Sequence, residues 1–192
     1  VFSWAALQPD ESTYDFSKLD KIMKLVKDNG LKVCMATSTA AHPAWMARKY
    51  PDVLRVEHSG MKRKFGARHN SCPNSPNYRK YSAALVEKIA ERYKDYDNIV
   101  AWHINNEFGG WCYCENCEKA FRVWLQKKYG TLDELNRVWN TSFWSHTMYD
   151  WDDVAACNML SEEFLWDGQI RTNFQGISLD YNRFNSDSML EC

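Results

Sequence analysis

The sequence lacks an excess of charge of either sign, a long apolar run and an internal repeat, and each absence excludes a class of protein. The 24 Lys and Arg residues nearly balance the 25 Asp and Glu residues, giving a net charge of −1. This balance offers little to attract a phosphate backbone, so we expect no nucleic-acid partner. Nor is there a stretch of about 18 apolar residues, so we expect no membrane span. No signal peptide is visible, and the chain begins at Val1 inside an apolar run. We therefore interpret it as a piece of a longer protein, truncated at both ends.

What the sequence does contain is a strand–helix order typical of an α/β fold. Apolar strands are expected at residues 1–7 and 31–39 and at residues 98–104. The second of them is expected to be buried, with Cys34 as a small hydrophobic residue within it. Helices are expected between and after them, where apolar residues recur at helical spacing. The last two are expected at about residues 118–129, where Gly130 ends the helix, and at about residues 132–139. Ser17 and Asp20 resemble a capping box for the first helix, and Pro76 is expected in the first turn of the second. Strand, helix, strand, helix, strand, helix predicts a parallel sheet with right-handed crossovers.

A carboxylate follows the third expected strand, at the edge of the sheet where α/β proteins bind ligands. Glu107 comes directly after Asn106 in "IVAWHINNE", and we expect an apolar floor beneath it. A strand end fixes the backbone well enough for a catalytic carboxyl group. A carboxylate that caps the next helix or pairs with a loop arginine remains the alternative interpretation.

Five segments resemble glycoside hydrolase family 42, the β-galactosidases, and together they span nearly the whole chain. They are "VFSWAALQPDESTYDFSKLD", "TSTAAHPAWMARKYPDVL", "HNSCPNSPNYRKY", "AWHINNEFGGWCYCENC" and "FRVWLQKKYGTLDELNRVWNTSFWS". The resemblance implies that residues 1–192 are a fragment of a single catalytic (β/α)8 TIM barrel, comprising about three central β/α units. It also implies a retaining enzyme that cleaves terminal β-D-galactosides with two carboxyl groups.

The same resemblance assigns roles to individual residues. It implies that Glu107 is the acid/base, that Asn106 holds the 2-hydroxyl of the sugar and that Arg68 contacts galactose. Trp144 lies where the family builds part of its sugar pocket from a loop. The nucleophile is expected on a later strand outside this chain, because neither Glu162 nor Glu163 has a matching context. We therefore expect the fragment alone to be inactive. The full-length protein is expected to be a homotrimer, as members of the family often are.

Seven cysteines without a secretory signal argue against a disulfide framework and favour a cytoplasmic protein. Cys112, Cys114 and Cys117 are spaced so that their thiolates can face one metal ion, which would need a fourth ligand from elsewhere. From the spacing alone, a redox pair or three unrelated thiols remain alternatives. The family resemblance implies a structural zinc bound by Cys72 together with these three. Such a zinc would join the loop of Arg68 to the loop after Glu107.

Three functional hypotheses follow from the sequence. The first is a retaining β-galactosidase, and the second is another glycosidase of the same clan acting on a different β-glycoside. The third is a non-catalytic, zinc-stabilised module that binds carbohydrate. The sequence beyond Cys192 distinguishes the third from the others, because a glycosidase needs a second strand-end carboxylate.

Overall fold

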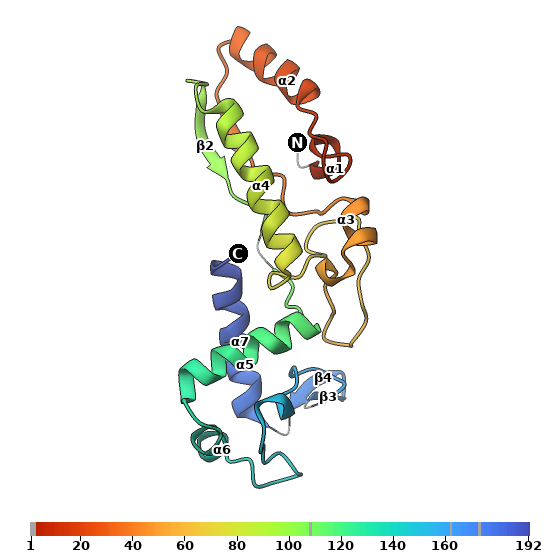
Figure 1. The fold of residues 1–192 in the computed structure, drawn as a ribbon, viewed down its shortest axis with the longest axis vertical. Coiled ribbons are helices and arrows are strands. Elements are labelled where there is room, and N and C mark those ends of the chain that lie inside the picture. Colours follow the sequence, from red (N-terminus) through yellow and green to blue (C-terminus); the bar gives the residue numbers. More distant parts are fainter. Residues whose placement is uncertain (1–2, 108, 162, 173) are drawn as a thin grey trace. The chain divides into compact units, whose positions relative to one another are not determined.

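The computed structural model describes residues 3–107, 109–161, 163–172 and 174–192. The chain, whose helices and strands are labelled in Figure 1, divides into two compact units. Each unit has its own hydrophobic core. The first unit comprises residues 1–54, 64–71 and 76–110, and the second comprises residues 55–63, 72–75 and 111–192. None of the described helices is long and apolar enough to cross a membrane.

The first unit is built on a parallel pair of strands with a long helix packed against them. The strands β1 and β2 pair from Val33 with Ile99 to Ala36 with His103. The helix α4 begins at Pro76, as predicted, and buries Leu85 and Ile89 in the core that Ile99 adjoins. In chain order the elements are α1 (Trp4–Leu7), α2 (Ser17–Asp28), β1 (Val33–Ala36), α3 (Ala44–Lys49), a 3-10 turn η1 (Pro51–Val53), α4 (Pro76–Tyr93) and β2 (Ile99–His103).

Three expectations for the first unit are wrong. Within the segment expected as a strand at residues 1–7, residues Trp4–Leu7 form the helix α1, which buries Trp4 and Leu7 three residues apart on one side. Residues 1 and 2 lie outside the described residues. The capping box is absent, because the carboxylate of Asp20 accepts bonds from Arg92 and Tyr93 instead. Cys34 is exposed rather than buried, since β1 pairs on one side only, with β2, among the described residues.

The second unit is mainly helical and carries one β-hairpin. The helix α5 ends at Gly130, whose φ of +75° provides the expected helix stop. The helix α6 has the predicted bounds and is capped by Thr131. The hairpin was not predicted, although its turn residues Asp167 and Gly168 both have positive φ, as a type I′ turn requires. The elements are α5 (Glu115–Tyr129), α6 (Leu132–Trp139), a 3-10 turn η2 (Trp151–Asp153), β3 (Glu163–Trp166), β4 (Gln169–Thr172) and α7 (Gln175–Leu190).

Candidate active site and metal centre

The polar turn after β2 is held against the end of β1 by a short ladder of hydrogen bonds. The backbone N–H of Thr37 donates to the carbonyl of His103 at 3.1 Å, which extends the parallel pairing beyond both strands. The hydroxyl of Thr37 then accepts from the backbone N–H of Asn105 at 3.0 Å. The side chain of Asn105 in turn accepts from the N–H of Asn106 at 2.8 Å. This ladder fixes the backbone immediately before Glu107.

Glu107 leaves this turn in a strained backbone conformation. Its φ is +48° and that of Asn105 is +61°, in the left-handed region that few residues other than glycine adopt. Strain of this kind costs about 1–3 kcal/mol per residue and persists where neighbouring contacts impose it. The carboxyl group projects outward with its side chain 68% exposed. The apolar floor that we expected beneath it is therefore not present among the described residues.

The guanidinium of Arg68 pairs with the carboxylate of Glu107. Its Nη2 lies 2.7 Å from Oε2 of Glu107. Two residues of left-handed backbone flank Arg68, with φ of +58° at Ala67 and +63° at His69. The N–H of His69 donates to the carbonyl of Ala40 at 3.0 Å. The structure thus brings together an arginine and a carboxylate that are 39 positions apart in the sequence, with Asn106 beside them.

Trp144 belongs to the second unit, in the loop that follows α6. Its side chain is 71% exposed, and its ring meets that of Phe143 edge to face with centroids 5.2 Å apart. The φ of +51° at Trp144 and +62° at Ser145 shows a second strained turn. The exposed indole leaves a ring face that could stack on a ligand.

Glu163 is one of the two glutamates considered, and not favoured, as the nucleophile from the sequence. Both of its carboxylate oxygens accept hydrogen bonds within the second unit. Its side chain is only 10% exposed and pairs with His58. It also accepts from the hydroxyl of Ser178 at 3.0 Å and from the thiol of Cys157 at 3.3 Å. A carboxylate held in this way ties the hairpin to its surroundings and offers no free oxygen for nucleophilic attack. Glu162 lies outside the described residues.

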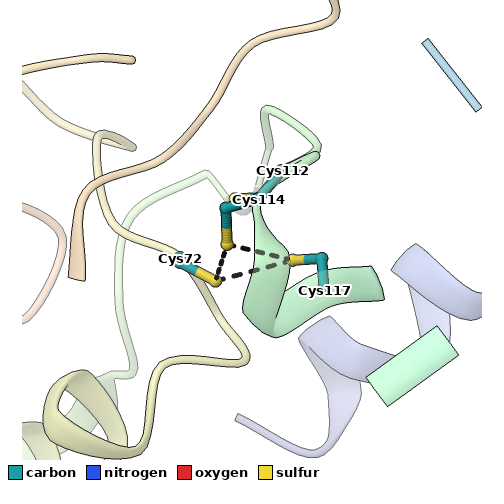
Figure 2. Close-up of side chains that lie close together, drawn as sticks. All are labelled: Cys72, Cys112, Cys114 and Cys117. Atoms are coloured by element: carbon teal, nitrogen blue, oxygen red, sulfur yellow. Dashed lines mark hydrogen bonds between the residues drawn. The ribbon is translucent and has the colours of Figure 1, made fainter. Parts of the chain in front are cut away.

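Four cysteines of the second unit converge on one point (Figure 2). The sulfur atoms of Cys72, Cys112, Cys114 and Cys117 all lie within 4.8 Å of one another, and all four thiols are free. Cys114 lies 3.4 Å from Cys72 and 3.9 Å from Cys117, while Cys72 and Cys117 are 3.5 Å apart. A tetrahedral zinc with Zn–S bonds of about 2.3 Å requires sulfur separations of about 3.8 Å. The donor set therefore fits zinc without rearrangement of the backbone.

Backbone and side-chain amides reinforce this cluster. The N–H of Val56 donates to the sulfur of Cys112, and the amide of Asn74 donates to the sulfur of Cys117, each at 3.5 Å. Such N–H···S bonds orient metal-binding thiolates and offset part of their negative charge. Tyr181 adds a bond from its hydroxyl to the carbonyl of Cys112 at 2.7 Å. The surroundings thus suit thiolates as well as thiols.

The pKa values of Cys114 and Cys72 are shifted in opposite directions within this cluster. The pKa of Cys114 lies below its ordinary value, because Cys112 first and then Cys117 and Cys72 hydrogen-bond to its sulfur. The pKa of Cys72 is raised by its contacts with Cys112, Cys114 and Cys117 and by burial. One sulfur therefore ionises readily while a neighbour resists a second negative charge. A divalent cation removes this conflict, since it stabilises all four thiolates together.

A carboxylate at the carboxyl end of a parallel strand lies where barrel enzymes place their catalytic residues, and most glycosidases use such carboxylates. The family model described as beta-galactosidase, glycoside hydrolase family 42, matches residues 1–192. The chain belongs to this family, which confirms the resemblance seen in the sequence.

Curated relatives agree over the whole chain. Beta-galactosidase BgaP of Planococcus sp. (strain L4) is 62% identical over 192 residues, which cover 100% of this chain and 28% of that protein. Beta-galactosidase LacZ of Lactobacillus acidophilus is 51% identical over 189 residues, which cover 98% of this chain and 28% of that protein. The chain thus spans about 28% of the length of the curated relatives it matches.

Solved structures agree on the fold. The crystal structure of beta-galactosidase from Bacillus circulans sp. alkalophilus superposes with a TM-score of 0.94 at 66% identity, covering 100% of this chain and 28% of that one. The beta-galactosidase from Rahnella sp. R3 superposes with a TM-score of 0.88 at 40% identity, covering 98% and 26%. Structures of this family are TIM barrels, so the expected α/β fold is confirmed, with this chain corresponding to part of a barrel.

Proposed function

We propose that the full-length protein is a retaining β-galactosidase and that residues 1–192 contribute half of its catalytic pair. The observation that carries the proposal is the position of Glu107 just beyond the carboxyl end of β2, in a chain of this family. In this proposal the 192 residues form part of one catalytic barrel domain. The nucleophile is a second glutamate outside them, at about 5–5.5 Å from the carboxyl group of Glu107 in the active enzyme.

Glu107 acts as the acid and then as the base. In the first step its carboxyl proton passes to the glycosidic oxygen as the bond to the anomeric carbon breaks and the nucleophile attaches to that carbon. In the second step the Glu107 carboxylate removes a proton from a water molecule as that water attacks the same carbon. The bond between the carbon and the nucleophile breaks, which releases galactose and restores the nucleophile as a carboxylate. The ladder through Thr37 and Asn105 supports this role, because it fixes the backbone from which the carboxyl group projects.

Three further residues bind the sugar in this proposal. Asn106 donates from its side-chain amide to the 2-hydroxyl, a contact that strengthens as the anomeric carbon becomes electron-deficient. Arg68 contacts galactose with the guanidinium that otherwise pairs with Glu107. Trp144 offers its exposed ring face to the sugar.

A structural zinc bound by Cys72, Cys112, Cys114 and Cys117 completes the proposal. Four thiolates leave no open position for a substrate, so the ion stabilises the local fold and takes no part in the chemistry. The sulfur separations and the N–H donors of Val56 and Asn74 support this assignment. Free thiols throughout the described residues are consistent with a reducing, cytoplasmic location, and we propose a homotrimer as the full-length assembly.

A substrate panel tests the proposed function. The full-length protein should hydrolyse an aryl β-galactoside much faster than the matching β-glucoside and β-fucoside. A preference for the glucoside or fucoside would assign the protein to another β-glycoside. Hydrolysis of none of the three would favour a carbohydrate-binding module, and loss of hydrolysis in Glu107→Gln would assign the chemistry to this carboxyl group.

A further inference from the structure

The loop that carries Arg68 is strained and depends on contacts from outside itself. Ala67 and His69 both adopt left-handed backbone around Arg68, and each such residue costs about 1 kcal/mol or more. Strained backbone of this kind persists only where surrounding contacts impose it. The contacts that hold this loop therefore determine where the guanidinium lies.

Those contacts come from the segment that follows β1 and from the segment before the loop. The N–H of His69 donates to the carbonyl of Ala40 at 3.0 Å, and Ser71 forms an antiparallel bridge with Leu54. One side chain joins this set of backbone contacts: the imidazole Nδ1 of His42 lies 2.7 Å from the hydroxyl of Ser71. A side-chain bond between segments 29 residues apart thus adds to the backbone contacts on the C-terminal side of Arg68.

His42 occupies this position at an energetic cost. His42 is only 4% exposed. Its Nε2 atom is buried and has no hydrogen-bond partner among the described residues. A buried polar atom without a partner costs about 1–3 kcal/mol, which an apolar residue would avoid. Burial also lowers the pKa of His42 to about 4, so the ring is neutral near pH 7 and pairs with a hydroxyl as either donor or acceptor. The contact with Ser71 is the interaction that compensates for this cost.

We propose that His42 is a positioning residue that sets the place of Arg68 through its bond to Ser71. The inference rests on the proposed role of Arg68 in binding galactose, and it adds a residue that touches neither the sugar nor Glu107. His42 acts on galactose binding only through Arg68. Loss of the His42 contact should therefore matter only while Arg68 is present.

A double-mutant cycle in the full-length protein tests this dependence. His42→Leu removes the ring nitrogens while keeping apolar bulk, and it should lower kcat/KM for an aryl β-galactoside by about 10- to 100-fold through misplacement of Arg68. In an Arg68→Ala background the same substitution should change kcat/KM less than about twofold, because the residue it positions is gone. His42→Asn places an amide atom near the position of Nδ1 and should restore most of the activity. Ile89→Val, a buried change in α4 that costs about 1 kcal/mol, controls for general destabilisation and should leave kcat/KM unchanged.

Limited trypsin digestion tests the contact between His42 and Ser71 by an assay that does not depend on catalysis. Cleavage after Arg68 should be at least about tenfold faster in His42→Leu than in wild type, since a loop released from its anchor opens more often, while His42→Asn should resemble wild type. An equal loss of kcat/KM with and without Arg68, or no change in either assay, would overturn the proposal. If the wild-type protein hydrolyses no galactoside, the proposed function is wrong, and the rate of cleavage alone decides whether His42 fixes Arg68.

Discussion

The distances between the sulfur atoms of the cysteine cluster predict that it binds zinc. The sulfur–sulfur distances of 3.4, 3.5 and 3.9 Å among Cys72, Cys114 and Cys117 lie within about 0.4 Å of the edge of a zinc–thiolate tetrahedron. Zinc can therefore bind without distorting the second unit, and its binding free energy should contribute to folding. At free zinc about 1,000 times above the dissociation constant, this contribution is about 4 kcal/mol.

Cys114→Ser is the perturbation, because Cys114 provides one of the four sulfur atoms and its pKa lies below the ordinary value. Full-length protein purified without chelator should contain one zinc per chain by elemental analysis, and the variant should lose it. The unfolding free energy of the variant should fall by about 4 kcal/mol at saturating zinc, while the wild type should lose the same amount when a chelator is added. Cys34→Ser is the matched control, since Cys34 is exposed and lies outside the cluster. It should keep both zinc and stability.

Thiol counting separates zinc from the alternatives. Denatured wild-type protein should release its zinc and expose every cysteine as a free thiol. Two missing thiols would indicate a disulfide and favour the redox interpretation of the C-x-x-C pair. Metal-free protein with unchanged stability would refute the zinc assignment.

Three further predictions follow from the described contacts. Because burial lowers the pKa of His42 from 6.5 to about 4, the unfolded chain takes up a proton between these pH values and the folded chain does not. The advantage in unfolding free energy of wild type over His42→Asn should thus fall by about 2 kcal/mol from about pH 7.5 to about pH 5, and a constant difference would contradict the neutral, buried ring. Asp180 is 1% exposed, accepts hydrogen bonds from Tyr129 at 2.6 Å and Trp139 at 3.1 Å, and pairs with Lys128. Asp180→Asn should therefore lower the unfolding free energy by about 3 kcal/mol. A loss below about 1 kcal/mol would show that the ion pair with Lys128 is not needed for stability. Residues 1–192 expressed alone should hydrolyse no aryl β-galactoside, since the described carboxylates include no partner for Glu107; activity that depends on Glu107 would mean that a second catalytic carboxylate lies within the chain.

Local patterns were sufficient to predict most of the helices. The start of α4 at Pro76, the end of α5 at Gly130 and the bounds of α6 depend on residues within a few positions of one another. The short segment at residues 1–7 was misassigned because seven apolar and small residues do not distinguish a strand from a buried helical turn. The hairpin of β3 and β4 had a usable signal in Asp167 and Gly168, a dipeptide typical of two-residue turns.

Only part of the candidate site could be predicted from the sequence. Spacing predicted Glu107 at the strand end, and the family resemblance predicted the four cysteines that the structure brings together. The anchor of the Arg68 loop could not be predicted, because the bond between His42 and Ser71 depends on how two distant loops fold together. The exposure of Glu107 and Cys34 likewise depends on what covers the sheet, which no local pattern contains.

Chemical rescue of Glu107→Gln in the full-length protein tests the central claim most directly. The variant should hydrolyse galactosides with poor leaving groups far more slowly than wild type, because no acid protonates the departing oxygen. Activated aryl galactosides should still form the galactosyl-enzyme, and added azide should then restore turnover with β-galactosyl azide as product, since an anion needs no general base. That product would identify Glu107 as the acid/base of a retaining β-galactosidase. Normal rates on galactosides with poor leaving groups, or no rescue by azide, would contradict the assignment.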